Sequence, residues 1–308
     1  MKVGNSCKKI TGVKYMEFLE LLAKIRTPFL DAFFQFCTYL GQDIPVLVVI
    51  CILFWCVNKK LGYQIGLTFF ASGLLLQNLK ITFRVERPWV LNPEFQAVES
   101  AIPAATGYSF PSGHTQTATA LYSSLALYTK KKSLKILLFL LFPLVGFSRM
   151  YLGCHTPKDV LTAIGITLAV SIPVYLFSKK LKNTDKENAL LCLILSVLSM
   201  LTFCYAAVLA LRGTISTENA MDCCKAGGAG LAFGISWYLE HRFINFSTDG
   251  SFKGKTLRFL FGIAVTALLH AGLKVLMPAT LVSAAVQYFL LVLWIVCLYP
   301  LIIKWKQT

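Results

Sequence analysis

His155 and Asp159 stand at a spacing that suits nucleophilic catalysis. Thr156-Pro157 between them is typical of an N-cap and first helical turn, so Asp159 becomes the third residue of a helix. Its carboxylate can then accept a hydrogen bond from one ring nitrogen of His155, which leaves the other nitrogen as a nucleophile or ligand. The competing interpretation is an interfacial histidine beside an ordinary capping aspartate, because carboxylates are favoured at helix N-termini.

The run Pro111-Ser112-Gly113-His114 has the features of an anion site with a proton donor beside it. Pro111 favours a helix start, where the amides of Ser112 and Gly113 would be free at the positive end of the helix dipole. His114 could give or take a proton near neutral pH. Taken alone, a plain helix cap with an interfacial histidine explains this run equally well.

Lys80 and Arg87 could supply positive charge to such a site. They are seven residues apart, close to two helical turns, so they share one face about 10 Å apart along the axis. Pro88 then ends the helix. Cations at the end of a spanning helix need an anion or must extend to the lipid headgroups. For Arg84, on nearly the same face, we favour headgroup contact over a second phosphate.

Composition shows which elements must position these residues. The chain has 308 residues, of which 56% are hydrophobic and 14% are charged, and its mean hydropathy is +0.65. A soluble domain carries roughly 25% charged residues. These values exclude an ordinary soluble protein and a disordered one. The net charge of +16 is better explained by loop lysines that orient a membrane protein than by a nucleic-acid partner.

We expect an all-α, polytopic membrane helix bundle. The stretch 16–41 is amphipathic and carries five charges, which predicts one helix lying in the membrane interface. Nine apolar segments follow and are expected to span the bilayer. Their approximate limits are 43–57, 61–82, 111–129, 136–152, 158–178, 188–211, 226–245, 259–277 and 281–303.

The basic residues sort the connections into two sides. If every segment spans, one side holds about twice as many lysines and arginines as the other, and this richer side should be cytoplasmic. Nine spans then put the N-terminus outside. The four lysines within residues 1–15 would favour the cytoplasm, but burying the charges of 16–41 would cost more. All the motifs above fall on the poorer side.

Together with Ser148-Arg149, the motifs supply three cations, free amides, an acid and a nucleophile, which is what a phosphate requires. Lys-x6-Arg-Pro, Pro-Ser-Gly-His and Ser-Arg-x5-His-x3-Asp resemble the three-part motif of the type 2 phosphatidic acid phosphatase superfamily. Its members include lipid phosphate phosphatases, polyprenyl pyrophosphate phosphatases, glucose 6-phosphatases and vanadium haloperoxidases. All eleven fixed positions match, in Lys80–Pro88, Pro111–His114 and Ser148–Asp159. The resemblance covers roughly residues 16–180 and implies a helical core like that of the haloperoxidases.

The resemblance implies a role for each motif residue. His155 would attack phosphorus and form a phosphohistidine, and Asp159 would orient it. His114 would protonate the leaving alkoxide and then activate water. The phosphoryl oxygens would be held by Lys80, Arg87, Ser112, Gly113 and Arg149, with Pro88, Pro111 and Ser148 as structural positions. Candidate substrate contacts are Arg84, Trp89, Tyr108 and Phe110. No metal or other cofactor is expected, because the three cations supply the charge that Mg²⁺ supplies in other phosphoryl transfers.

The expected function is an integral membrane phosphatase that cleaves a phosphate monoester or pyrophosphate on a lipid of polyprenyl pyrophosphate or phosphatidate type. A phosphotransferase that passes the phosphoryl group to an acceptor lipid stays open, as does a non-catalytic lipid-phosphate binder or transporter. A sugar phosphate is an alternative substrate. The expected partners are the lipid substrate and the bilayer, without nucleic acid, and the sequence assigns no oligomeric state.

We favour a bacterial plasma membrane, with the active site on the extracytoplasmic side, over the endoplasmic reticulum. Residues 1–187 are expected to hold the interfacial helix and the catalytic core. Residues 188–308 would add further transmembrane helices to the same membrane domain, without an assigned role.

Overall fold

The computed structural model describes residues 15–307, in which all regular secondary structure is helical and no strand occurs. The lysines within residues 1–14, which bear on the side of the N-terminus, lie outside the described residues. A helix over 15–24 comes first. The long elements after it are α2 (Pro28–Tyr39), α3 (Asp43–Ile52), α4 (Lys59–Phe83), α6 (Gly113–Tyr128), α7 (Lys132–Tyr151), α8 (Pro157–Lys180), α9 (Asp185–Leu211), α10 (Thr217–Leu239), α11 (Phe252–Leu276) and α12 (Leu281–Leu293).

Shorter elements extend or connect these helices. Wider π-helical turns continue three of them, at η1 (Leu53–Val57), η3 (Glu240–Ile244) and η4 (Trp294–Leu298). The last of these turns leads into α13 (Tyr299–Trp305). A short helix α5 (Pro88–Leu91) and a 3₁₀ turn η2 (Glu99–Ala101) lie in the long connection between α4 and α6.

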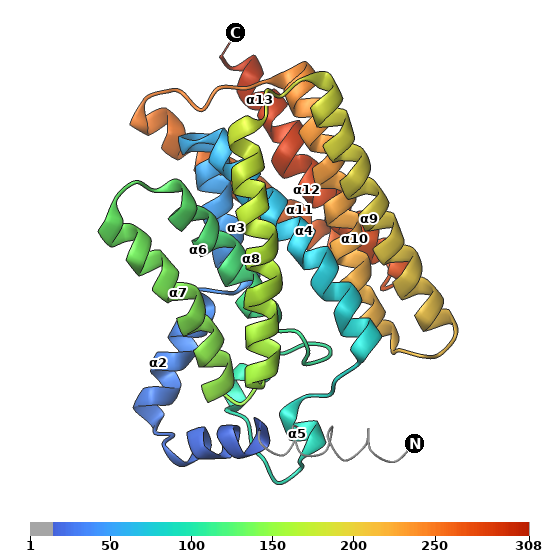
Figure 1. The fold of residues 1–308 in the computed structure, drawn as a ribbon. Coiled ribbons are helices and arrows are strands. Elements are labelled where there is room, and N and C mark those ends of the chain that lie inside the picture. The colour runs from blue at the N-terminus through green and yellow to red at the C-terminus, as the bar shows by residue number, and fades with distance from the viewer. Residues whose placement is uncertain (1–14, 308) are drawn as a thin grey trace.

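α4 lies between two groups of helices. It packs against α6 and α8 on one side and against α9 and α10 on the other, as Figure 1 shows. α6 also packs against α7, and α10 also packs against α12. The N-terminal and C-terminal halves of the chain therefore share one bundle, with α4 at its centre.

Each of the nine apolar segments forms helix. Five helical stretches are long and apolar enough to cross a membrane: α7, α8, α9, α11 and the stretch Leu281–Trp305. A sixth is added if α2 and the stretch Asp43–Val57, which meet at an angle of 44°, count as one broken span. The chain is therefore an integral membrane protein with at least five candidate spans among its described residues.

The prediction of one helix over 16–41 is wrong. The chain forms a helix over 15–24, turns at Arg26, and starts α2 at Pro28. Thr27 caps α2 by accepting a hydrogen bond from the Leu30 amide, and proline at the first helical position favours this new start. Arg26 donates to the carbonyl oxygens of Tyr151 and Gln96, which holds the turn against the end of α7.

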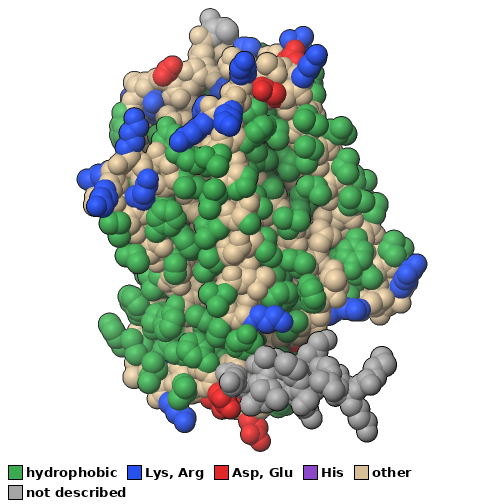
Figure 2. Space-filling model, in the orientation of Figure 1, with side chains coloured by type: hydrophobic (Ala, Val, Ile, Leu, Met, Phe, Trp, Pro, Cys, Tyr) green, Lys and Arg blue, Asp and Glu red, His purple; other side chains and the backbone are tan. Residues whose placement is uncertain are grey.

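Lysine and arginine side chains gather at the upper end of the face shown in Figure 2, above a broad hydrophobic band. Contacts join the connections at this end: Asn58 donates to the Tyr128 hydroxyl at 2.6 Å, and Arg242 pairs with Asp185 at 3.1 Å. The lysine-rich connections thus lie together, as their charge predicted. We call this the lysine-rich end of the bundle.

Candidate active site

Four helix ends meet at the opposite end of the bundle (Figure 1). α4 and α7 finish there, and α6 and α8 begin there. The connection over 84–112 covers this end. The three sequence motifs, which lie on these helix ends, are therefore brought together as expected.

His155 is buried in the turn between α7 and α8. Its Nε2 atom lies 2.9 Å from Nη1 of Arg87. A guanidinium group can only donate, so Nε2 is the acceptor and the ring proton is assigned to Nδ1. This tautomer leaves a lone pair on the ring nitrogen that faces the cation, as a nucleophile toward phosphorus requires.

The direct hydrogen bond predicted between His155 and Asp159 is absent, because the Nδ1–Oδ2 distance is 3.6 Å. Ser109 stands between them. Its Oγ donates to Oδ2 of Asp159 at 2.6 Å and lies 3.5 Å from Nδ1 of His155. The same Oδ2 accepts from the Thr156 amide at 2.8 Å, which completes the capping box of α8. The carboxylate is therefore fixed by the helix N-terminus, and the Ser109 hydroxyl links it to the imidazole.

Three buried nitrogen atoms from the motifs have no hydrogen-bond partner among the described residues: Nε and Nη2 of Arg149 and Nε2 of His114. Arg149 is fully buried and uses only Nη1, which donates to Thr38 Oγ1 at 3.1 Å. A buried donor left without an acceptor costs about 1–3 kcal/mol, and more when it is charged. The two Arg149 nitrogens can only donate and are therefore placed for an anionic ligand, and His114 Nε2 can join them when it carries a proton.

Of the two amides predicted to be free at the start of α6, that of Ser112 is engaged. The Ser112 amide donates to the carbonyl oxygen of Asp159 at 3.2 Å, so that amide is not available to a ligand. The Ser112 hydroxyl accepts from Thr115 and keeps its own hydrogen free to donate. A Cβ atom added to Gly113 would meet nothing within 4 Å, so open space lies beside this backbone. A phosphoryl oxygen can approach there.

Lys80 and Arg87 are oriented by three consecutive carbonyl oxygens of the connection. Arg87 Nη2 donates to Thr106 O at 2.6 Å and its Nε donates to Gly107 O at 2.9 Å. Lys80 Nζ donates to Tyr108 O at 2.9 Å. Thr106 and Gly107 were not predicted from the sequence, because a backbone carbonyl group that binds a cation leaves no pattern in side-chain types.

The cations act on His155 electrostatically. Burial first, and then the charges of Arg87, Arg149 and Lys80, hold the pKa of His155 well below its usual value. Burial also lowers the pKa of Arg87 to about 10, so Arg87 stays charged at neutral pH. The imidazole is therefore neutral at physiological pH, the form in which it can attack.

The three aromatic residues predicted to contact substrate differ in their burial and in their neighbours. Tyr108 packs against a hydrophobic cluster that includes Ile81 and the α10 residues Ala220, Cys223 and Cys224. Phe110 is buried against Phe83, and the Lys158 ammonium lies over its ring. Trp89 is half-buried beside Arg87, whose guanidinium carbon lies 6.0 Å from the ring centroid. These three aromatic residues border the site.

Arg84 does not join the site. It caps α4 in the left-handed conformation with φ of 49° and is exposed. The structural motif positions behave as such: Ser148 donates only to the Val145 carbonyl oxygen at 2.7 Å, Pro88 begins α5, and Pro111 lies buried next to the α6 cap. Within residues 15–307, no group of three or more His, Cys, Asp or Glu side chains could hold a metal ion.

Family models match both halves of the chain. Residues 61–183 match the model of the PAP2 superfamily, the type 2 phosphatidic acid phosphatases. Residues 224–306 match a second model, the transmembrane extension of PAP2 superfamily phosphatases. The chain belongs to the PAP2 superfamily. The first match contains all three motifs, and the second covers most of α10 and the helices after it but not α9.

Several PAP2 relatives are named phosphatases. Phosphatidylglycerophosphatase B of Bacillus subtilis is 28% identical over 52% of this chain and 80% of its own length. Undecaprenyl-diphosphatase BcrC of the same organism is 29% identical over 41% of this chain and 62% of its own length. A dihydrosphingosine 1-phosphate phosphatase of Schizosaccharomyces pombe is 29% identical, but the match covers 47% of this chain and 38% of that protein.

Solved PAP2 structures are also similar to this chain. The transmembrane phosphatidylglycerolphosphate phosphatase from Bacillus subtilis is 27% identical, with a TM-score of 0.48 over 56% of this chain and 88% of that one. LpxE of Aquifex aeolicus is 28% identical, with a TM-score of 0.44 over 51% and 92%. The family matches and the named relatives, rather than these structures, identify the chain as a PAP2 phosphatase of the lipid phosphate hydrolase kind.

Proposed function

We propose that this protein hydrolyses a lipid phosphate monoester or pyrophosphate through a phosphohistidine on His155, without a metal ion. The unpartnered, buried nitrogen atoms of Arg149 and His114 carry this proposal, because an anion with several acceptor oxygens would satisfy them together. The named activities of the PAP2 relatives support a lipid substrate.

The first step is attack by Nε2 of His155 on phosphorus. Before substrate binds, Arg87 Nη1 donates a hydrogen bond to the lone pair on His155 Nε2. A phosphoryl oxygen would accept this hydrogen bond instead, and the lone pair on Nε2 would then be free to attack. The N–P bond forms as the P–O bond to the lipid breaks. His114 enters this step as the imidazolium, gives one proton to the leaving oxygen and becomes neutral. Lys80, Arg87 and Arg149, with the Gly113 amide and the Ser112 hydroxyl, bind the three phosphoryl oxygens. Asp159 stabilises the positive charge that develops on the ring, through Ser109.

The second step releases phosphate. His114, now neutral, takes a proton from water as the water oxygen attacks phosphorus, and the N–P bond breaks. Inorganic phosphate leaves and His155 regains its starting form. The three cations provide the charge stabilisation, so no step calls for a divalent ion.

We propose nine spans for the membrane topology. Besides the five apolar stretches, these would be α4, α6, α10 and the stretch Asp43–Val57. α4 and α6 are largely buried by other helices, which explains why their sequences are less apolar than those of lipid-facing helices. The lysine-rich end would face the cytoplasm, and the active site would face the outside of a bacterial plasma membrane. Residues 1–187 of this membrane domain would hold the catalytic core.

A substrate panel tests this function. Purified protein in detergent would be given undecaprenyl pyrophosphate, phosphatidic acid, phosphatidylglycerol phosphate and a sugar phosphate, all with EDTA present. We expect phosphate release from at least one lipid and little from the sugar phosphate. Transfer of the phosphoryl group to an added acceptor lipid, without release of inorganic phosphate, would show a phosphotransferase. Binding of the lipids without any release would show a binding protein.

A further inference from the structure

The segment that orients the two cations is itself held by α10. Oγ1 of Thr106 donates to Oδ2 of Asp222 at 3.3 Å, while Lys225 Nζ donates to the other carboxylate oxygen at 2.9 Å. Gly107, at φ of +62°, passes so close that a Cβ atom there would lie 3.2 Å from Oδ1 of Asn219. α10 therefore contacts the segment whose carbonyl groups orient Lys80 and Arg87.

Two hydrogen bonds connect Asp222 to Arg87. The first joins its carboxylate to the Thr106 hydroxyl, and the second joins the Thr106 carbonyl oxygen to Arg87 Nη2 at 2.6 Å. Asp222 lies outside both family-model matches, which cover 61–183 and 224–306. We propose that Asp222 is a positioning residue: by fixing Thr106, it holds the carbonyl groups that orient Arg87 and Lys80 toward the phosphate. The effect on catalysis rests on the proposed function.

Hydrogen exchange tests the structural part without any assay of activity. In Asp222→Ala, the amides of residues 105–109 should exchange faster than in the wild type. Asp222→Asn keeps an oxygen that accepts from Thr106 and should restore slow exchange. Glu218→Gln, an exposed acid on the first turn of α10, serves as control. Unchanged exchange in Asp222→Ala would overturn the proposal.

Kinetics test the link to Arg87. Asp222→Ala and Thr106→Val should each lower kcat/KM about five-fold, as expected for one hydrogen bond of roughly 1 kcal/mol. The double variant should be no worse than either single variant, because both changes break the same connection. A double variant whose loss of kcat/KM equals the product of the two single losses would contradict the proposed connection. A wild type without phosphatase activity would instead refute the proposed function, while the exchange data would still decide the role of Asp222.

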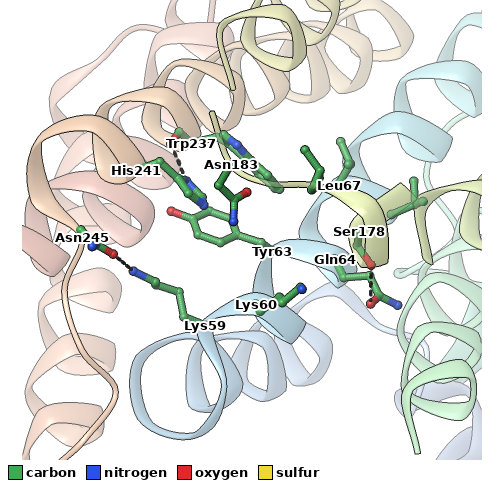
Figure 3. A pocket seen from close by; sticks show the side chains of 12 residues that line it. Lys59, Lys60, Tyr63, Gln64, Leu67, Ser178, Asn183, Trp237, His241 and Asn245 are labelled. Atoms are coloured by element: carbon green, nitrogen blue, oxygen red, sulfur yellow. Dashed lines mark hydrogen bonds between the residues drawn. The ribbon is translucent and has the colours of Figure 1, made fainter. Parts of the chain in front are cut away.

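A second observation, at the lysine-rich end, concerns a cavity of about 130 Å³ (Figure 3). It lies between α4, the end of α8 and the end of α10, and it is remote from the motif residues. Its lining includes Lys59 and Lys60 at the start of α4, Gln64 further along that helix, and Ser178 near the end of α8.

The cavity has donors that the protein does not use. Gln64 is only 4% exposed; its Oε1 accepts from Ser178 at 3.3 Å, and its Nε2 has no partner. The Lys60 ammonium lies at the mouth and makes no hydrogen bond or ion pair with the described residues. By contrast, Lys59 is fully engaged with Glu240 and two acceptors at 245–246. A cation and a buried amide are therefore both available to an anion.

The place of the cavity favours a lipid headgroup. Lys59 and Lys60 line it at the lysine-rich end, the level that headgroups occupy if the helices span. Basic pockets between transmembrane helices at this level bind anionic headgroups. The structure also assigns this cavity as a site for the phosphate of an anionic lipid, independent of the active site.

Lipid retention tests this site. In native mass spectrometry, the wild type should keep phosphatidylglycerol in preference to phosphatidylcholine. Lys60→Gln should reduce that retention about five-fold, and Lys130→Gln, an exposed lysine at the same end, should not. Equal loss in both variants, or no preference between the lipids, would overturn the proposal.

Adding inorganic phosphate distinguishes a free phosphate ion in the cavity from the phosphate of a lipid headgroup. Binding of phosphate at the active site should raise the Tm of wild type and Lys60→Gln alike. A larger rise in the wild type, with no lipid preference, would identify the ligand as free phosphate rather than a headgroup.

Discussion

At the scale of single residues, Ser109 has the least expected role. Its hydroxyl group donates to the Asp159 carboxylate and lies 3.5 Å from Nδ1 of the ring that should carry the phosphoryl group, while the carboxylate itself lies 3.6 Å from that nitrogen. Ser109→Ala should therefore lower kcat about 10–100-fold, within the range that one positioned proton-transfer or charge-stabilising group contributes. Phosphate release from the best lipid of the panel measures this.

Ser148 provides the matched control. It is also a buried serine of the site region, but its hydroxyl donates only to a carbonyl oxygen of its own helix. Ser148→Ala should change kcat less than three-fold and affect mainly stability, by about 1 kcal/mol. Equal losses of kcat in the two variants would show that Ser109 has no special part in the chemistry.

The pH dependence follows from His155. Its pKa lies well below the usual value of about 6.5, so the imidazole stays neutral and nucleophilic at mildly acidic pH. The acid limb of kcat/KM should therefore have its midpoint well below pH 6.5, after correction for ionisation of the substrate phosphate. An acid midpoint at or above pH 6.5 that belongs to the enzyme would contradict this electrostatic account.

The lowered pKa of His155 also makes the stability of the fold depend on pH. Below about pH 6.5 the unfolded chain binds a proton at this histidine and the folded chain does not. This group therefore favours unfolding as pH falls, until the lowered pKa is reached.

At the scale of elements, α10 packs through its glycines. Gly228 faces α12 so closely that an added Cβ atom would overlap with the carbonyl oxygen of Ala285. Gly230 approaches Ser199 of α9 in the same way. The small residues that the sequence shows at 227–234 thus allow close contact with two helices.

Alanine substitutions test this packing. Gly228→Ala should lower the Tm clearly, because the helices must separate to admit a methyl group. Gly272→Ala in α11 is the control: nothing lies within 4 Å of the added atom, and alanine is the better helix former by about 0.5–1 kcal/mol. It should leave the Tm unchanged or raise it. The reverse order would show that α10 is not packed this way.

Element positions were predictable where hydrophobic runs are long, and less so where they are short. Each of the nine apolar segments is helical, with limits that differ mainly at the ends. The amphipathic pattern of the stretch 16–41 predicts one helix, but the chain forms two. Thr27-Pro28, an N-cap and first-turn pair like Thr156-Pro157, was the signal for the break.

At the scale of the whole molecule, the site was predictable only in part. The motif residues could be assigned because their types and spacing carry information. Ser109, Thr106 and Asp222 could not, since each acts through a contact with residues 50 or more positions away or through a backbone group. Such contacts depend on how the helices assemble, which no local pattern encodes.

Membrane orientation can be tested with single cysteines. Glu94→Cys lies in the connection that covers the active site, and Lys130→Cys lies at the lysine-rich end. A membrane-impermeant maleimide should label Glu94→Cys in intact cells and Lys130→Cys only after permeabilisation, with the wild type as background for the natural cysteines. Labelling of both from one side would contradict the proposed topology.

The central claim is that His155 carries the phosphoryl group, and trapping that intermediate tests it most directly. The enzyme would be mixed with a lipid substrate labelled with ³²P at its terminal phosphate, quenched in alkali and digested. We predict label on the peptide that contains His155, stable in alkali and lost in acid as for a phosphoramidate, and absent from His155→Ala. Phosphate release by an active wild type with no such label, or release that survives in His155→Ala, would contradict the account.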